Sequence, residues 1–83
     1  MAGVAQRPVV AFILVNVEMG AEEEVREALL KKHGGHVTEA WITYGEFDLV
    51  VKVEVVSMND LEKVTTAIRT ISGVRRTVTL IAV

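Results

Sequence analysis

Residues 9–17 read Val-Val-Ala-Phe-Ile-Leu-Val-Asn-Val, and this stretch decides the fold. Its β-branched side chains favour extended backbone, so the stretch predicts a strand. Successive side chains of a strand point to opposite faces of the sheet. Both faces are apolar here, with Ala11, Ile13, Val15 and Val17 on one and Val10, Phe12 and Leu14 on the other. We therefore expect a buried central strand.

The pattern that follows predicts a helix and then a hairpin. Residues 21–32 place apolar side chains at helical spacing, and the glutamates of the first turn and lysines of the last turn complement the helix dipole. The glycines at residues 34–35 are expected to end this helix. Residues 36–44 and 49–56 predict two strands, and the short turn at residues 45–48 makes them an antiparallel hairpin.

The rest of the chain adds one helix and one strand. Ser57 or Asn59 can cap the helix, residues 72–73 are expected to end it, and residues 74–83 predict the last strand. The order β-α-β-β-α-β is typical of the α+β ferredoxin-like sandwich, a four-stranded antiparallel sheet with two helices on one face. The other face is left bare although the first strand is apolar on it. We therefore predict a homodimer that packs through the open sheet face.

Length and composition fit one small domain. The chain has 83 residues, of which 51% are hydrophobic and 24% are charged, and this composition excludes intrinsic disorder. Residues 1–8 show no periodicity and end in the only proline, so we expect a flexible N-terminal arm there. Residues 9–83 then form the folded domain.

Charge, hydropathy and cysteine content exclude several partners. The net charge of −2 argues against direct DNA binding, because nucleic-acid-binding domains usually carry a basic excess. The longest apolar run has seven residues, whereas a membrane span needs about 20, so we expect no membrane association. The chain has no cysteine, which excludes disulfides and thiolate metal sites and is compatible with the cytoplasm, where we expect the protein to reside.

No catalytic motif is present. His33 and His36 could hold a metal, but the glycines between them predict a flexible helix end and no third ligand is evident, so we expect solvated turn histidines. No serine has an identifiable base, and no glycine-rich phosphate-binding motif occurs. The sequence therefore predicts no catalytic residue, no metal and no cofactor.

Two segments carry a concentration of polar groups. Residues 44–48, Tyr-Gly-Glu-Phe-Asp, predict a turn with two acids, and Thr77 and Thr79 place two hydroxyls on one face of the last strand. Each feature alone is ordinary. Residues 44–49 and residues 72–81, Ser-Gly-Val-Arg-Arg-Thr-Val-Thr-Leu-Ile, together resemble the ligand-binding (RAM) domain of the Lrp/AsnC transcription regulators. The resemblance extends over residues 12–83.

This resemblance implies a regulatory domain, not an enzyme, that binds free amino acids or related small molecules between neighbouring dimers. Asp48 suits the ligand's ammonium, and the backbone around Gly45 and the hydroxyls of Thr77 and Thr79 suit its carboxylate. By resemblance, the hairpin comes from one dimer and the last strand from a neighbour. The ligand-binding residues that it implies are Tyr44, Gly45, Glu46, Asp48, Asp60, Thr77 and Thr79.

Members of this family usually carry an N-terminal helix-turn-helix domain, and too few residues precede the first strand here to form one. The chain therefore resembles the stand-alone form of the domain, and a full-length Lrp/AsnC regulator is an expected partner. Two alternatives remain: an ACT-like regulatory domain, and a small dimeric ferredoxin-like enzyme of the monooxygenase or isomerase type. Such an enzyme needs polar side chains that point into the core, and Asn16, Trp41 and the histidines are the candidates.

Overall fold

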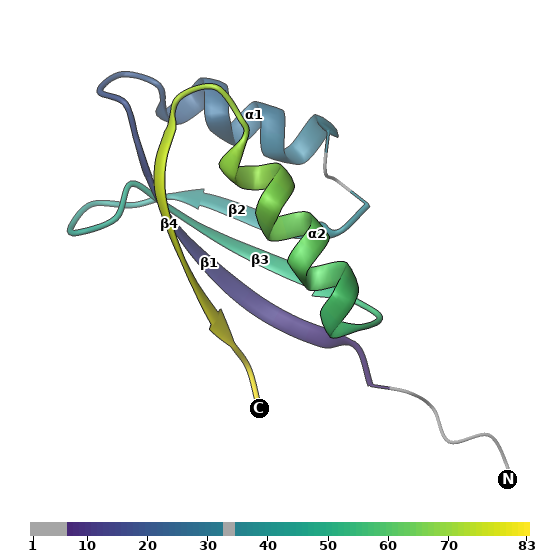
Figure 1. Ribbon diagram of the computed structural model, residues 1–83. Coiled ribbons are helices and arrows are strands. Elements are labelled where there is room, and N and C mark those ends of the chain that lie inside the picture. The colour runs from purple at the N-terminus through teal and green to yellow at the C-terminus, as the bar shows by residue number, and fades with distance from the viewer. Residues whose placement is uncertain (1–6, 33–34) are drawn as a thin grey trace, which may run out of the picture.

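The computed structural model describes residues 7–32 and 35–83. Four strands form an antiparallel sheet in the order β2-β3-β1-β4, and both helices lie on one side of it (Figure 1). The predicted ferredoxin-like sandwich is therefore confirmed. The elements are β1 (Val9–Val17), α1 (Glu22–Lys32), β2 (Val37–Ile42), β3 (Leu49–Val55), α2 (Met58–Arg69) and β4 (Val74–Ile81).

β1 lies in the middle of the sheet and supplies the centre of the core. Its side chains Ala11, Ile13 and Val15 have no exposed surface. They pack under the helices, where α1 contributes Val25 and Leu29. α2, β2 and β3 complete this core with Leu61, Val64, Ile68, Val37, Ala40, Leu49, Val51, Val53 and Val55. Apolar residues recur about every 3.6 residues in the helices and every second residue in the strands, so their side chains meet in one layer between the helices and the sheet.

The element boundaries differ from the sequence-based prediction by a few residues. β2 ends at Ile42, before Tyr44, because residues 43–48 form a closed loop. Of the two predicted caps, Ser57 and Asn59, α2 uses Ser57, whose Oγ accepts the Asp60 N–H at 3.1 Å. It ends at Arg69, earlier than predicted, because the Thr70 N–H and Oγ1 both donate to the carbonyl of Ala67.

Three other predicted features differ or are not tested. α1 begins one residue later than predicted, at Glu22, and β4 ends at Ile81, before the chain end. Residues 33–34, where His33 and part of the expected helix stop lie, are outside the described residues. Most of the predicted arm, residues 1–6, is outside them as well.

The second face of the sheet has no helix over it. One row across this face is apolar on all four strands, formed by Trp41, Val50, Leu14 and Val78. The adjacent row places Phe12 beside Leu80, and these side chains are 38% and 52% exposed. The described chain therefore presents a broad apolar surface, which we call the open face.

Candidate functional site

The loop of residues 43–48 is closed by its own hydrogen bonds. The Thr43 N–H donates to the carbonyl of Asp48 at 2.9 Å, and Thr43 Oγ1 donates to the carbonyl of Phe47 at 2.8 Å. Gly45 has a φ of 124°, a region that other residues rarely adopt, so glycine is required at the tip. The loop has a defined shape set by a hydroxyl and a glycine.

The same loop is fixed to the end of β1. The Asp48 N–H donates to the carbonyl of Val15 at 2.9 Å, and Asn16 Nδ2 donates to the carbonyl of Glu46 at 2.8 Å. β1 and β4 lose register between Asn16 and Val17, and there the Val17 N–H donates to Asp48 Oδ2 at 2.8 Å. One carboxylate oxygen of Asp48 therefore has a structural role, and it holds the side chain in place.

A hollow of about 400 Å³ lies between this loop and the start of α1. It brings together three of the predicted site residues, Tyr44, Gly45 and Asp48. Glu22 and Glu23 of the first helical turn also line it, as do Ile42 and Thr43. Tyr44 is fully exposed, so its ring is available for contact with another molecule. Glu46 belongs to the same loop but does not line this hollow.

A second hollow, of about 320 Å³, lies on the other side of Asp48. Asn16 and Val17 at the end of β1 and Arg75 and Arg76 at the start of β4 complete its lining. The Arg76 guanidinium carbon lies 5.6 Å from the centre of the Phe47 ring, within the range of a cation–π contact. Asp48 thus separates an acidic hollow from a basic one.

The two predicted threonines lie apart from the loop. Thr77 and Thr79 pair with Val15 and Ile13 of β1, so they share the helix-covered face with the core. Thr77 Oγ1 accepts a hydrogen bond from Arg69 Nε at 3.3 Å, and Thr79 lines a hollow of about 210 Å³ between β4 and α2. Neither threonine lines a hollow with Asp48 in this chain.

The remaining predicted residue, Asp60, is also separate. It lies in the first turn of α2, where its N–H is bound by the cap, and it lines none of the three hollows described above. One described chain therefore gathers Tyr44, Gly45 and Asp48 but not Asp60, Thr77 and Thr79. A site that uses all of them requires more than one copy of the chain.

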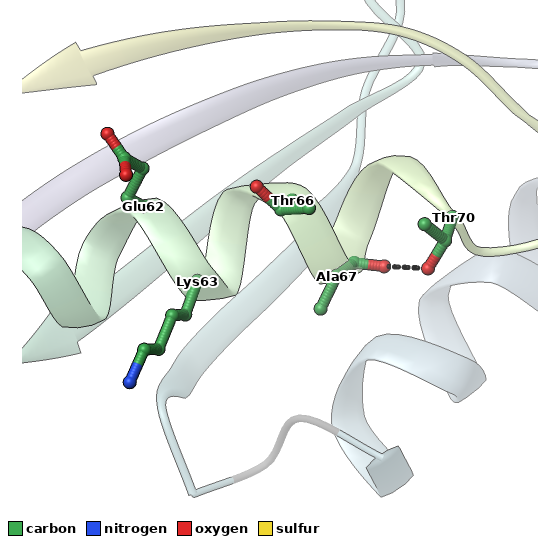
Figure 2. Close-up of a pocket in the computed structure, with 5 residues that line it drawn as sticks. All are labelled: Glu62, Lys63, Thr66, Ala67 and Thr70. Carbon is green, nitrogen blue, oxygen red and sulfur yellow. Dashed lines mark hydrogen bonds between the residues drawn. The ribbon is translucent and has the colours of Figure 1, made fainter.

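A further hollow runs along the exposed side of α2, and Figure 2 shows its five lining residues. Its polar groups do not converge on a common point: Glu62 and Lys63 point away from each other, and the Thr70 hydroxyl is bound to the Ala67 carbonyl (Figure 2). All five belong to one helix and its C-cap. We therefore do not regard this groove as a binding site.

Among the described residues, the polar side chains that an enzyme would need do not point into the core. Asn16 is bound to the loop, and Trp41 is exposed with its Nε1–H donating to Glu39 at 2.9 Å. Thr65 is the one buried polar residue in the described part of the chain, and its hydroxyl donates to the carbonyl of Glu62. His36 is exposed. Within residues 7–32 and 35–83, no cluster of acids and histidines could hold a metal ion.

Neither helix of the described chain is long and apolar enough to cross a membrane.

Sequence reasoning missed the residues that surround Asp48. Arg75 and Arg76 lie beside Asp48 because the strand order places β1 between β3 and β4, and Glu22 lies beside it because α1 packs on β2. The Arg75-Arg76 pair is a usable signal, since two adjacent cations follow Gly73 after one intervening residue, Val74. The glutamates were explained by the helix dipole, and that explanation gave no reason to expect them near the hairpin.

Comparison with known proteins identifies related chains. The sequence model described as the Lrp/AsnC ligand binding domain matches residues 10–83. The chain is 33% identical over 73 residues to the HTH-type transcriptional regulator FL11 of Pyrococcus furiosus, which covers 88% of this chain and 47% of the regulator. It thus spans about half the length of the curated relatives it matches.

Two solved structures are similar in both sequence and fold. FFRP-DM1 has a TM-score of 0.83 and 43% identity, and the match covers 90% of this chain and 99% of that one. The hypothetical protein PHS023 of Pyrococcus horikoshii has a TM-score of 0.81 and 43% identity, covering 90% of this chain and 89% of that one. The curated relatives are named as transcriptional regulators, and the family match disfavours the ACT-like alternative.

Proposed function

Because the chain belongs to the Lrp/AsnC ligand binding domain family, we propose that it binds a free amino acid, or a related small molecule, and assembles from dimers around it. The observation that carries this proposal is the position of Asp48. Its carboxylate is held by the Val17 N–H through Oδ2, and among the described residues Oδ1 accepts no hydrogen bond. A fixed carboxylate with one free oxygen suits an α-ammonium group.

The charges and donors around this carboxylate fit the rest of an amino acid. The ligand's ammonium pairs with Asp48, and its side chain extends along the loop beside the exposed Tyr44. Thr77 and Thr79 contribute hydroxyls from a neighbouring dimer, because the same chain does not bring them to Asp48. Gly45, Glu46 and Asp60 complete the contact surface.

The open face provides the dimer interface. Its apolar row crosses every strand, and Trp41 at the edge strand is 61% exposed. A second copy placed face to face removes this surface from water on both chains at once, as a two-fold axis requires. Lys52 lies in the same row as Phe12 and Leu80, and it forms an ion pair with Glu54 at 3.8 Å.

Binding then regulates by changing the assembly. A ligand that contacts residues of two dimers binds the joined dimers more tightly than the separate ones. The ratio of these two affinities sets how far the ligand shifts the equilibrium toward the joined state. We propose that the output is an interaction with a DNA-binding relative of the same family. The domain itself carries a net charge of −2 and is not expected to hold duplex DNA at physiological salt.

Thermal unfolding in the presence of each of the twenty amino acids tests this function. At least one should raise the melting temperature of the wild type, because a ligand of the native state stabilises it. Asp48→Asn should abolish the increase, since the amide oxygen can still accept the Val17 N–H while the charge is lost. The loss of a charged hydrogen bond amounts to about 1.5–3 kcal/mol, or roughly ten- to a hundredfold in affinity.

Matched variants rank the other contacts. Asp60→Asn should reduce the ligand effect less than Asp48→Asn, and Thr77→Val or Thr79→Val should each remove one neutral hydroxyl and have a smaller effect. Glu62→Gln, which loses a charge on the exposed side of α2, is the control and should respond like the wild type. The function is contradicted if no amino acid raises the melting temperature, or if Asp48→Asn responds in full.

A further inference from the structure

The basic hollow beside Asp48 contains two arginines that form no salt bridge within the described residues. In the described part of the chain, salt bridges join Lys31 to Glu27 and Lys52 to Glu54, and neither Arg75 nor Arg76 takes part in one. Both arginines line the hollow of about 320 Å³, together with Asn16, Val17 and Asp48. Two positive charges therefore face one carboxylate there, which leaves the hollow able to accept an anion.

The walls of this hollow are fixed. Asn16 is bound to the loop carbonyl of Glu46, and Asp48 is bound to the Val17 N–H. Arg76 lies opposite Asn16 in the β1–β4 ladder, and its guanidinium carbon lies 5.6 Å from the centre of the Phe47 ring. A cation–π contact at this distance favours one position of the guanidinium and leaves N–H groups available to a ligand.

We propose that this hollow binds the carboxylate of a small organic acid, with Arg76 as the main partner and Arg75 as a second cation. The proposal rests on the proposed function and deepens it: the α-carboxylate of the amino acid pairs with Arg76, and its α-ammonium pairs with Asp48. Both partners then come from one chain. The hydroxyls of Thr77 and Thr79 contribute neutral hydrogen bonds from the neighbouring dimer.

The chemistry favours a carboxylate over a phosphate. A guanidinium presents a planar pair of N–H donors, which matches the two oxygens of a carboxylate. Asp48 lines the same hollow, and its negative charge opposes a phosphate dianion more strongly than a monoanion. The same Asp48 attracts the ammonium next to the carboxylate. The hollow therefore selects a zwitterion whose two opposite charges are carried by groups attached to the same carbon atom.

The test is titration calorimetry with three classes of probe. The first is the free amino acids, the second their α-carboxamides, which lack the carboxylate, and the third their 2-oxo acids, which lack the ammonium. Arg76→Gln should weaken amino-acid binding about ten- to a hundredfold and leave the carboxamide, which has no carboxylate, unchanged. Asp48→Asn should weaken the amino acid but not the 2-oxo acid, which has no ammonium. Arg76→Lys keeps the charge without the planar fork and should lie between wild type and Arg76→Gln.

Lys63→Gln is the matched control, because it removes a cation from the outer surface of α2, and it should bind every probe like the wild type. Equal amino-acid affinity in wild type and Arg76→Gln overturns this inference and leaves the proposed function standing. If a 2-oxo acid binds through Arg76 and no amino acid binds, the arginine site stands and the proposed function is overturned. Binding of none of the probes overturns both, and tighter binding of inorganic phosphate overturns the carboxylate assignment.

Discussion

The two faces of the sheet are built from the same strands but differ in what covers them. On β1, Ile13 faces the helices and is fully buried, while its neighbours Phe12 and Leu14 face the other way. Both faces have apolar side chains, so composition alone does not separate them. The helices account for the hydrophobic residues of one face only. The other face keeps a surface whose burial requires a second molecule.

The same substitution at adjacent residues of β1 should therefore have different consequences, loss of folding on one face and loss of association on the other. Ile13→Asp should have the largest effect, because it places an unpaired charge in a closed core and costs several kcal/mol, enough to unfold a domain of this size. Far-UV circular dichroism and urea unfolding measure it. A cooperative transition near that of the wild type would contradict the assignment of this face as the core.

Leu14→Asp is the matched change one residue later, on the open face. It should leave each chain folded and shift the mass in solution downward, because the charge becomes buried only when two chains associate. Phe12→Asp should act in the same way. Light scattering and circular dichroism on the same sample separate loss of association from loss of fold. An unchanged mass for both variants would show that the interface lies elsewhere.

The loops at the end of the sheet repeat this comparison on a smaller scale. Gly73 has a φ of 97°, and an added Cβ would lie 3.2 Å from Ala21 and Val25 beneath the covered face. Gly45 also has a positive φ, but a Cβ there meets no neighbouring atom. Gly45→Ala should cost about 1–2 kcal/mol from backbone strain alone, and Gly73→Ala should cost more because it adds crowding. Thermal denaturation compares them, and equal costs would mean that the contact at Gly73 relaxes freely.

Most of the fold could be predicted from the sequence, because the spacing of apolar residues and the positions of turn residues determine helices, strands and turns within short segments of the chain. The order of elements and the position of the hairpin followed from these patterns, whereas the helix cap was narrowed only to Ser57 or Asn59. Boundaries such as the end of β2 could not, since they depend on hydrogen bonds from Thr43 to residues four and five positions later.

The candidate site could be predicted only in part. Residues 44–48 are contiguous, so the sequence alone indicates that they lie together. The hydrogen bond from the Val17 N–H to Asp48, by contrast, depends on a register shift between β1 and β4. The meeting of Arg76 with Phe47 depends on strand order in the same way. Such contacts join residues that are distant in sequence, and no local pattern encodes them.

The proposed assembly depends most on a second copy of the chain that covers the open face. Multi-angle light scattering of the wild type at micromolar concentration tests it directly. The expected mass is at least twice the 9.1 kDa of one chain, and amino acids that raise the melting temperature should shift the distribution between assemblies. A single species of 9.1 kDa, unchanged by every amino acid, would contradict it.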